Sequence, residues 1–147
     1  MRRDRSLLKT IALGSSLLLA ACESAEQARG RQLFTGEQPL NGRIVGHAST
    51  LPPHAGRCVN CHADSGATPA AASSAAQGFG TSLSRDSLAS LRPRRGGPPS
   101  RFDESSLCRL LRTGVDPAHV VIQRSMPRYE LSDADCRALW AHLSKQS

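Results

Sequence analysis

The stretch Arg57-Cys58-Val59-Asn60-Cys61-His62 decides how the rest of the chain is interpreted. Two residues separate its cysteines, and a histidine follows the second cysteine directly. On one helical turn, two thiols at this spacing can each add to a vinyl group of a porphyrin, and the adjacent imidazole can bind the iron. The sequence therefore predicts a covalently attached c-type haem on Cys58 and Cys61, with His62 as an axial ligand.

Three other interpretations of this stretch stay open: a zinc site, a redox-active dithiol and a chance occurrence. A zinc site would need two further ligands at regular spacing, but the chain contains no second Cys-x-x-Cys pair and no His-x-x-x-His pair. A thioredoxin-like dithiol lies within a βαβ pattern, whereas the flanks of this stretch are typical of loops. The histidine next to Cys61 favours haem over these alternatives.

The N-terminal residues have the pattern of a bacterial export signal. Four basic residues precede or flank the start of a short apolar run, residues 11–21, which is too short to predict a membrane-spanning helix. The run leads into Leu19-Ala20-Ala21-Cys22, which resembles the lipobox of bacterial lipoproteins. We expect a lipoprotein signal peptide at 1–21, lipid on Cys22, a tether at 22–28 and one domain at 29–147. An ordinary cleavage site with an incidental cysteine is the alternative.

Composition narrows the classes of function. Without residues 1–21 the chain keeps 126 of its 147 residues, enough for one domain. Aromatic residues make up only 3% of the sequence, so a buried porphyrin would supply apolar area that the core lacks. The signal holds four of 19 basic and one of 12 acidic residues, so its removal lowers the net charge from +7 to +4. This mildly basic balance favours an acidic redox partner protein, and we expect no nucleic-acid binding.

Met126 is the second candidate ligand of the iron. It is the only methionine besides Met1, and Pro127 follows it in an irregular segment, whereas core methionines usually lie on helix or strand faces. Its thioether is a ligand that raises the reduction potential of haem iron. The alternative is a methionine that only packs on the haem. The other possible ligands, which we expect to be structural, are His47, His54, His119 and His142.

Capping residues and apolar spacing predict four helices. They are expected at residues 24–34, 85–91, 103–113 and 132–143. Between them we expect a short extended piece at 43–45, a small-residue insertion at 66–82 and a basic loop at 92–101. The basic loop is either a solvated connector or a docking patch for a partner.

Cys108 and Cys136 remain after one cysteine is assigned to lipid and two to haem. An exported compartment permits disulfides, so we expect these two residues to be bonded. The bond would close a loop that contains Met126, which would stabilise the chain by roughly 3–4 kcal/mol. The alternative is a pair of reduced core thiols.

These features, in this order, resemble a class I, mitochondrial-type, bacterial monohaem cytochrome c. The resemblance rests on a first helix with Gly30 and Phe34, the Cys58–His62 stretch, the Met126-Pro127 loop and a closing helix. It implies an all-α cytochrome c fold, with three to five helices packed around one covalently bound haem and with long loops. It also implies that the first helix crosses the last one near Leu139, Trp140 and Leu143.

The chain departs from that family at three points. The link from Thr35 to Arg57 is longer than is usual, and His142 stands where a tyrosine is common. The segment after His62 has no clear Gly-Pro-x-Leu, so Pro69 is the nearest candidate to supply the carbonyl that accepts the His62 Nδ1 proton.

With His62 and Met126 in both axial positions, the iron would have no open position for a substrate. We therefore expect a one-electron carrier rather than an enzyme, anchored by lipid on Cys22 to the periplasmic side of a bacterial membrane. Its partners would be an electron donor and an electron acceptor protein. Two alternatives stay open: a five-coordinate haem sensor or peroxidase-like protein, and a haem subunit of a periplasmic dehydrogenase complex.

Overall fold

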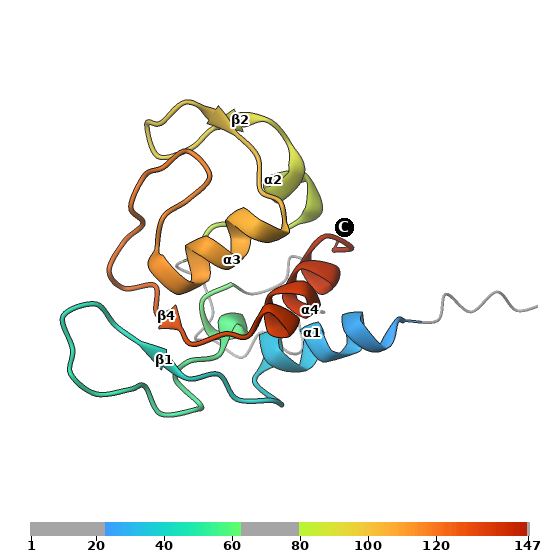
Figure 1. The fold of residues 1–147 in the computed structure, drawn as a ribbon, viewed down its shortest axis with the longest axis vertical. Helices are drawn as coiled ribbons and strands as arrows, with labels where there is room; N and C mark the ends of the chain where they lie inside the picture. The colour runs from blue at the N-terminus through green and yellow to red at the C-terminus, as the bar shows by residue number, and fades with distance from the viewer. Residues whose placement is uncertain (1–22, 63–79, 147) are drawn as a thin grey trace, which may run out of the picture.

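The computed structural model describes residues 23–62 and 80–146 (Figure 1). Its elements are α1 (Ala25–Thr35), β1 (Gly42–Arg43), the 3-10 turn η1 (Cys58–Asn60), α2 (Arg85–Ala89), β2 (Arg92–Pro93), β3 (Pro99–Ser100), α3 (Glu104–Thr113), β4 (Arg128–Tyr129) and α4 (Asp133–Leu143). The predicted signal peptide, Cys22 and most of the 66–82 insertion lie outside the described residues. No helix in the described ranges is both long enough and apolar enough to span a membrane.

The predicted all-α fold class is wrong, because the described residues also form two small antiparallel sheets. β1 pairs with β4, and β2 pairs with β3. The strands come from segments rich in glycine and proline, residue types that disfavour a continuous helix. Their backbone groups find partners across short ladders instead. The chain is therefore mixed α and β, and the structure corrects the fold class implied by the resemblance.

The four predicted helices are present, and their ends lie within two residues of the expected positions. Ser24 and Ser132 cap α1 and α4 by accepting hydrogen bonds from backbone N–H groups one turn further on. Gly36 and Gly114 follow α1 and α3 with φ of 78° and 79°, a left-handed conformation that favours glycine. However, α1 starts at Ala25, so most of the predicted tether at 22–28 is helical.

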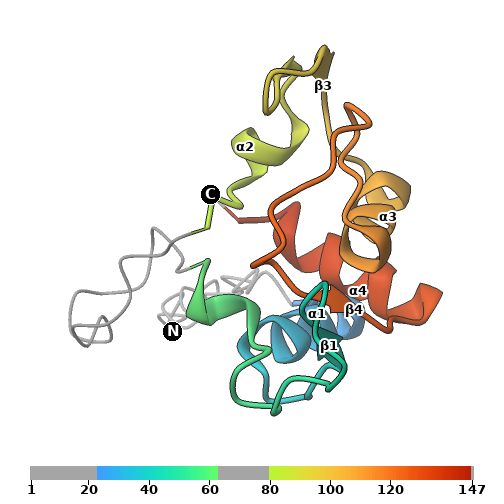
Figure 2. The same ribbon diagram turned by 90° about the vertical axis from the view of Figure 1, so that its left-hand side faces the viewer.

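α1 and α4 cross in close contact, and Figures 1 and 2 both show them side by side. Gly30 permits this approach, since a Cβ at that position would lie only 2.6 Å from the carbonyl carbon of Ala138. The Phe34 ring centre lies 5.4 Å from that of His142. The predicted crossing of the first and last helices is confirmed. Gly30 approaches Ala138 and Phe34 approaches His142, neither of which was among the expected partners Leu139, Trp140 and Leu143.

One buried apolar cluster unites the helices. Its members are Leu33, Phe34, Leu40, Leu88, Leu107, Cys108, Leu111, Tyr129, Leu131, Cys136, Ala138, Leu139 and Leu143. A set of partly buried apolar residues, here called the apolar rim, packs against it: Cys58, Val59, Leu83, Phe102, Met126 and Trp140. Residues from η1 and from the Met126 segment therefore contact the same core.

The predicted basic loop at 92–101 contains the β2–β3 hairpin. Arg95 and Gly96 adopt φ of 47° and 79° at its tip, and the Gly97 N–H donates to the Arg94 carbonyl over 2.7 Å. The Arg94 side chain turns inward and lies 4.8 Å from the centre of the Phe102 ring. It donates to the backbone carbonyls of Ser87, Leu88, Ser90 and Ser100. Arg94 therefore fastens the hairpin to α2 and is not part of a solvated connector.

Candidate haem-binding site

The two thiols and the imidazole of the candidate motif extend from a single turn of the backbone. The Cys61 and His62 N–H groups donate to the Cys58 carbonyl over 3.1 Å and 2.9 Å, which closes the turn that η1 begins. Cys58 is partly buried, Cys61 is exposed, and neither is in a disulfide. α1 contacts this turn, and Figure 2 shows the two next to each other. The turn is therefore held against the α1–α4 pair.

A backbone carbonyl fixes the orientation of His62. Its Nδ1 lies 2.8 Å from the carbonyl oxygen of Thr81. A carbonyl can only accept, so Nδ1 carries the proton and Nε2 keeps a lone pair for a metal. Pro69, the acceptor suggested by the sequence, lies outside the described residues.

Gly80 brings Thr81 to the His62 ring. Its N–H donates to the Cys61 carbonyl over 3.0 Å, and a Cβ on Gly80 would overlap the imidazole and approach that carbonyl to 2.8 Å. Glycine is thus the residue that lets the chain pass so close to His62. Sequence reasoning missed this contact because residues 62 and 80 are separated by the insertion.

Tyr129 links the Cys58 motif to the segment that follows Met126. Its O–H donates to the Gly56 carbonyl over 2.9 Å, two residues before Cys58. Burial raises the pKa of the Cys58 thiol to about 11 and also raises the pKa of Tyr129. Both groups are therefore protonated at neutral pH.

Met126 is partly buried and packs against the core. Its N–H donates to the Gln123 carbonyl over 3.3 Å, and β4 begins two residues later. β4 pairs with β1 in the register Gly42 with Tyr129 and Arg43 with Arg128. The extended piece expected at 43–45 overlaps β1 only at Arg43, because β1 covers Gly42–Arg43. The long link before Cys58 thus supplies a strand that holds the backbone after Met126.

The four other histidines differ in their surroundings. His47, His54 and His119 are exposed. His142 packs against Phe34, and its Nε2 lies 2.8 Å from the amide nitrogen of Gln146. Met126 belongs to the apolar rim, which also includes Cys58, whereas His47, His54 and His119 are exposed.

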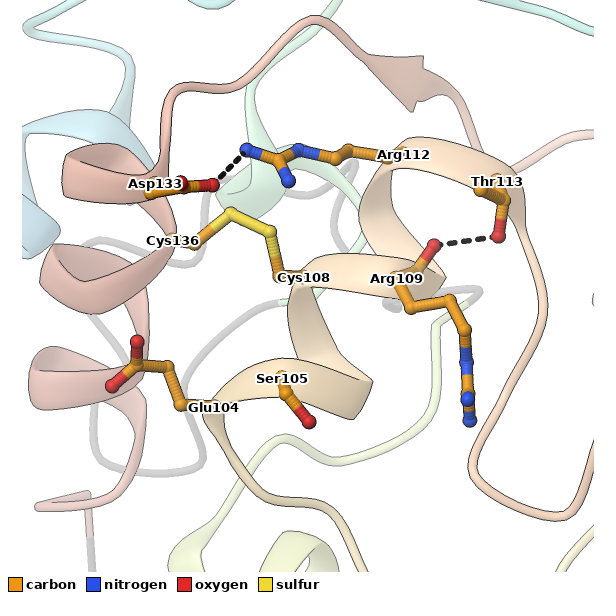
Figure 3. Close-up of a pocket in the computed structure, with 8 residues that line it drawn as sticks. All are labelled: Glu104, Ser105, Cys108, Arg109, Arg112, Thr113, Asp133 and Cys136. Atoms are coloured by element: carbon orange, nitrogen blue, oxygen red, sulfur yellow. Dashed lines mark hydrogen bonds and ion pairs between the residues drawn. A yellow bond between two sulfur atoms is a disulfide. The ribbon is translucent and has the colours of Figure 1, made fainter.

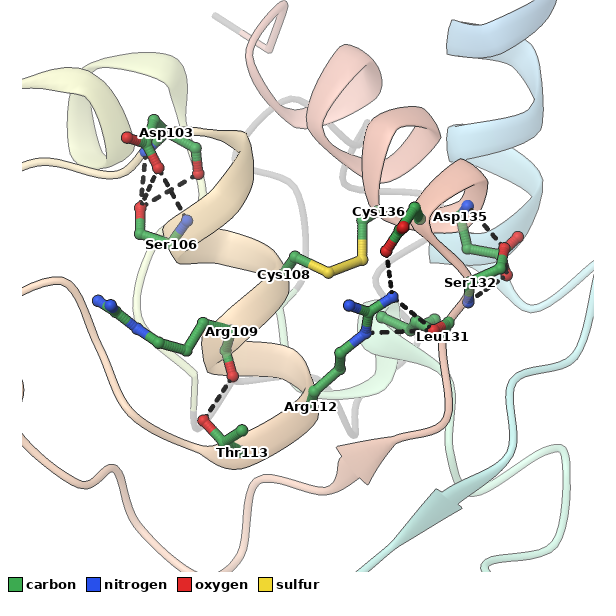
Figure 4. Close-up of a disulfide and its surroundings, with 11 residues drawn as sticks. Asp103, Ser106, Cys108, Arg109, Arg112, Thr113, Leu131, Ser132, Asp135 and Cys136 are labelled. Carbon is green, nitrogen blue, oxygen red and sulfur yellow. Dashed lines mark hydrogen bonds and ion pairs between the residues drawn. A yellow bond between two sulfur atoms is a disulfide. The ribbon is translucent and has the colours of Figure 1, made fainter.

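Cys108 and Cys136 form a disulfide that joins α3 to α4, with their Cα atoms 5.3 Å apart (Figure 4). Beside it, the Arg112 guanidinium donates to the Leu131 carbonyl over 2.7 Å and to the Asp133 carboxylate over 2.8 Å. The two helices that flank the Met126 segment are thus connected both covalently and by hydrogen bonds.

A surface pocket of about 400 Å³ lies over this disulfide (Figure 3). Its lining residues are Glu104, Ser105, Cys108, Arg109, Arg112, Thr113, Asp133 and Cys136. The pocket includes none of the four candidate haem-binding residues, and its Arg112 and Asp133 already form an ion pair. It is a feature of the α3–α4 junction and is separate from the candidate haem residues.

The residues present fit a covalently attached haem. Two thiols outside any disulfide, one exposed and one partly buried, share one turn with an oriented imidazole. A rim of partly buried apolar side chains offers a surface that a porphyrin could cover. Across 23–62 and 80–146, no three or more His, Cys, Asp or Glu side chains are grouped so that they could bind a metal ion. Comparisons with models of known protein families, with curated proteins and with solved structures found no match.

Proposed function

We propose that this chain is a monohaem c-type cytochrome that carries one electron at a time between partner proteins. The observation that supports this most strongly is the arrangement of His62. It follows Cys58 and Cys61 on one turn, and the Thr81 carbonyl holds its Nδ1 so that Nε2 keeps the lone pair for iron. A zinc or dithiol site would not need an imidazole fixed in this way directly after the second cysteine.

Each residue of the site has a distinct task in this proposal. Cys58 and Cys61 would hold the porphyrin through thioether bonds, and His62 and Met126 would bind its iron. The bound haem would supply an iron that accepts and releases a single electron. With both axial positions filled by the chain, no position remains for a substrate, so the protein transfers electrons and is not an enzyme.

The location is part of the same proposal. Covalent haem attachment and a disulfide both fit an exported protein. The Leu19–Cys22 pattern would place lipid on Cys22 and hold the protein at the periplasmic side of a bacterial membrane. There it would exchange electrons with one donor and one acceptor protein. A Cys22→Ser variant should then move from the membrane fraction to the soluble fraction of the cell.

The optical spectrum of the oxidised holoprotein tests the axial ligands. We expect a sulfur-to-iron charge-transfer band in the unmodified protein, loss of this band in Met126→Ala, and a lower reduction potential in that variant. His119→Ala is the matched control, because His119 is a nearby but exposed alternative, and it should keep both properties. A Met126→Ala protein with unchanged spectrum and potential would refute the role of Met126. Rapid cyanide binding to the unmodified protein would favour a five-coordinate haem.

A further inference from the structure

The segment between α3 and β4 is closed at its base by Gly114. The Ile122 N–H donates to the Gly114 carbonyl over 2.9 Å, and Val115 and Val121 form an isolated antiparallel bridge. Met126 follows four residues after Ile122, beyond this closed part of the loop. The position of the Met126 backbone relative to α3 therefore depends on the contacts of residues 123–128.

Arg128 makes that connection. Its guanidinium donates to the Met126 carbonyl over 2.5 Å and to the Ile122 carbonyl over 3.4 Å. It lies against Gly114, where a Cβ would overlap the guanidinium group. Gly114 therefore has two roles: its left-handed φ of 79° ends α3, and its missing side chain leaves room for Arg128.

The environment of Arg128 is unusual for an arginine. Within the described residues it forms no ion pair, and its buried Nε has no hydrogen-bond partner. An arginine that only served solubility would extend into water, whereas this side chain is partly buried against backbone. Its planar fork can bind two carbonyls at once, which an uncharged side chain of similar length cannot do.

We propose that Arg128 is the positioning residue for Met126. It bridges the end of α3 and the Met126 carbonyl, and so keeps the methionine sulfur in place as a ligand of iron. A series of contacts connects Met126 to the helices. The disulfide joins α4 to α3, and α3 ends at Gly114. Arg128 lies against Gly114 and donates to the Met126 carbonyl. This inference rests on the proposed haem function, since without iron Met126 would have nothing to bind.

Cyanide binding to the ferric holoprotein tests the proposal, because cyanide must displace Met126. In Arg128→Met, the apolar stem remains and every donor is lost, so we expect cyanide affinity to rise by about tenfold or more. The haem content should stay unchanged. Arg128→Lys, which keeps the charge but lacks the fork, should give an intermediate affinity. Arg124→Met is the matched control, since Arg124 is exposed in the same segment, and its affinity should equal that of the unmodified protein.

A double-variant cycle separates this role from simple loss of stability. Gly114→Ala should also raise cyanide affinity, because its Cβ displaces the guanidinium. In the Arg128→Met background, Gly114→Ala should have a smaller effect than in the unmodified protein, since only the strain of its left-handed φ remains. Equal cyanide affinities for Arg128→Met and Arg124→Met, or fully additive effects in the cycle, would overturn the role of Arg128. Absence of the charge-transfer band from the unmodified protein would instead refute Met126 ligation itself.

Discussion

The contact between Gly80 and His62 illustrates how single residues determine this site. A histidine beside a Cys-x-x-Cys pair can bind iron only if its ring is held at a suitable orientation. Here the backbone supplies that orientation through the Thr81 carbonyl, and Gly80 allows the approach. The chain thus uses main-chain atoms, which substitution of Thr81 would not remove, to orient the candidate ligand.

On the proposed haem function, Gly80→Ala should therefore weaken the bond between His62 and iron. The added Cβ would overlap the imidazole, and altered support of a metal-binding histidine typically costs about tenfold in affinity. A weaker bond releases His62 more readily on heating, so the thermal transition of the haem spectrum should occur at a lower temperature than in the unmodified protein. Gly56→Ala is the control, because a Cβ there would lie 3.7 Å from the Leu40 carbonyl, an ordinary contact. Equal transitions in both variants would contradict the role of Gly80.

Single residues also show where sequence reasoning reached its limit. The spacing of Cys58, Cys61 and His62 predicted a candidate site because its chemistry is local in sequence. Tyr129 and Thr81 could not be found in that way. Tyr129 reaches a carbonyl 73 residues away, and Thr81 reaches a histidine 19 residues away. Only the folded chain brings these partners together.

At the scale of elements, the helices were predictable and the pairing of the strands was not. Helix ends depend on local groups, such as the Ser132 cap or Gly36, which can be recognised in the sequence. β1 and β4 are two residues long and pair across more than eighty residues, so no periodic pattern marks them. The all-α prediction failed for this reason.

Gly30→Ala tests the α1–α4 crossing with two opposed expectations. Helix propensity alone predicts stabilisation by up to about 1 kcal/mol, because alanine is the better helix former. The contact with Ala138 predicts the reverse, a loss of about 1–3 kcal/mol from overpacking. We expect the free energy of unfolding, measured in urea, to fall by this amount. Gln32→Ala, on the exposed side of α1, should change it by less than about 0.5 kcal/mol. Stabilisation by Gly30→Ala would show that the helices do not cross so closely.

Asp103→Asn tests the α3 cap through pH. Hydrogen bonds from the Ser106 hydroxyl and N–H hold the pKa of Asp103 below its ordinary value. The charged carboxylate therefore contributes stability above the unfolded pKa of about 3.9, and this contribution is lost as pH falls through the lower folded value. Asparagine still caps but carries no charge. The gap in melting temperature between the two proteins should be widest above pH 5 and shrink towards pH 2.

If the melting temperatures of Asp103→Asn and the unmodified protein differed by the same amount above pH 5 and near pH 2, the Asp103 charge would not stabilise α3. Glu130→Gln is the control for general charge effects, because Glu130 is exposed outside the helices. The gap in melting temperature between Glu130→Gln and the unmodified protein should change little over the same pH range.

At the scale of the whole molecule, long-range links hold together a chain with few aromatic residues. The disulfide joins residues 28 positions apart and encloses the Met126 segment. The β1–β4 ladder and the Tyr129 hydrogen bond connect that segment to the Cys58 motif from the other side. The segment that contains Met126 is thus connected to both the N-terminal and the C-terminal half of the described chain.

The Cys108→Ser/Cys136→Ser variant should therefore be less stable by roughly 3–4 kcal/mol, because the unfolded chain regains the freedom that the closed loop removes. Urea unfolding of the oxidised proteins measures this difference. A thiol reductant acts on the iron of both proteins but on a disulfide in only the unmodified one, so it should bring the two free energies of unfolding close together. An equal free energy of unfolding with and without the disulfide would contradict its structural role.

The most direct test of the central claim is the mass and colour of the denatured chain after maturation with export and haem-attachment machinery. We predict that the unfolded protein keeps the mass and visible absorption of one haem per chain, and that Cys58→Ser/Cys61→Ser loses both. A denatured chain that is colourless and has the mass of the polypeptide alone would contradict the account.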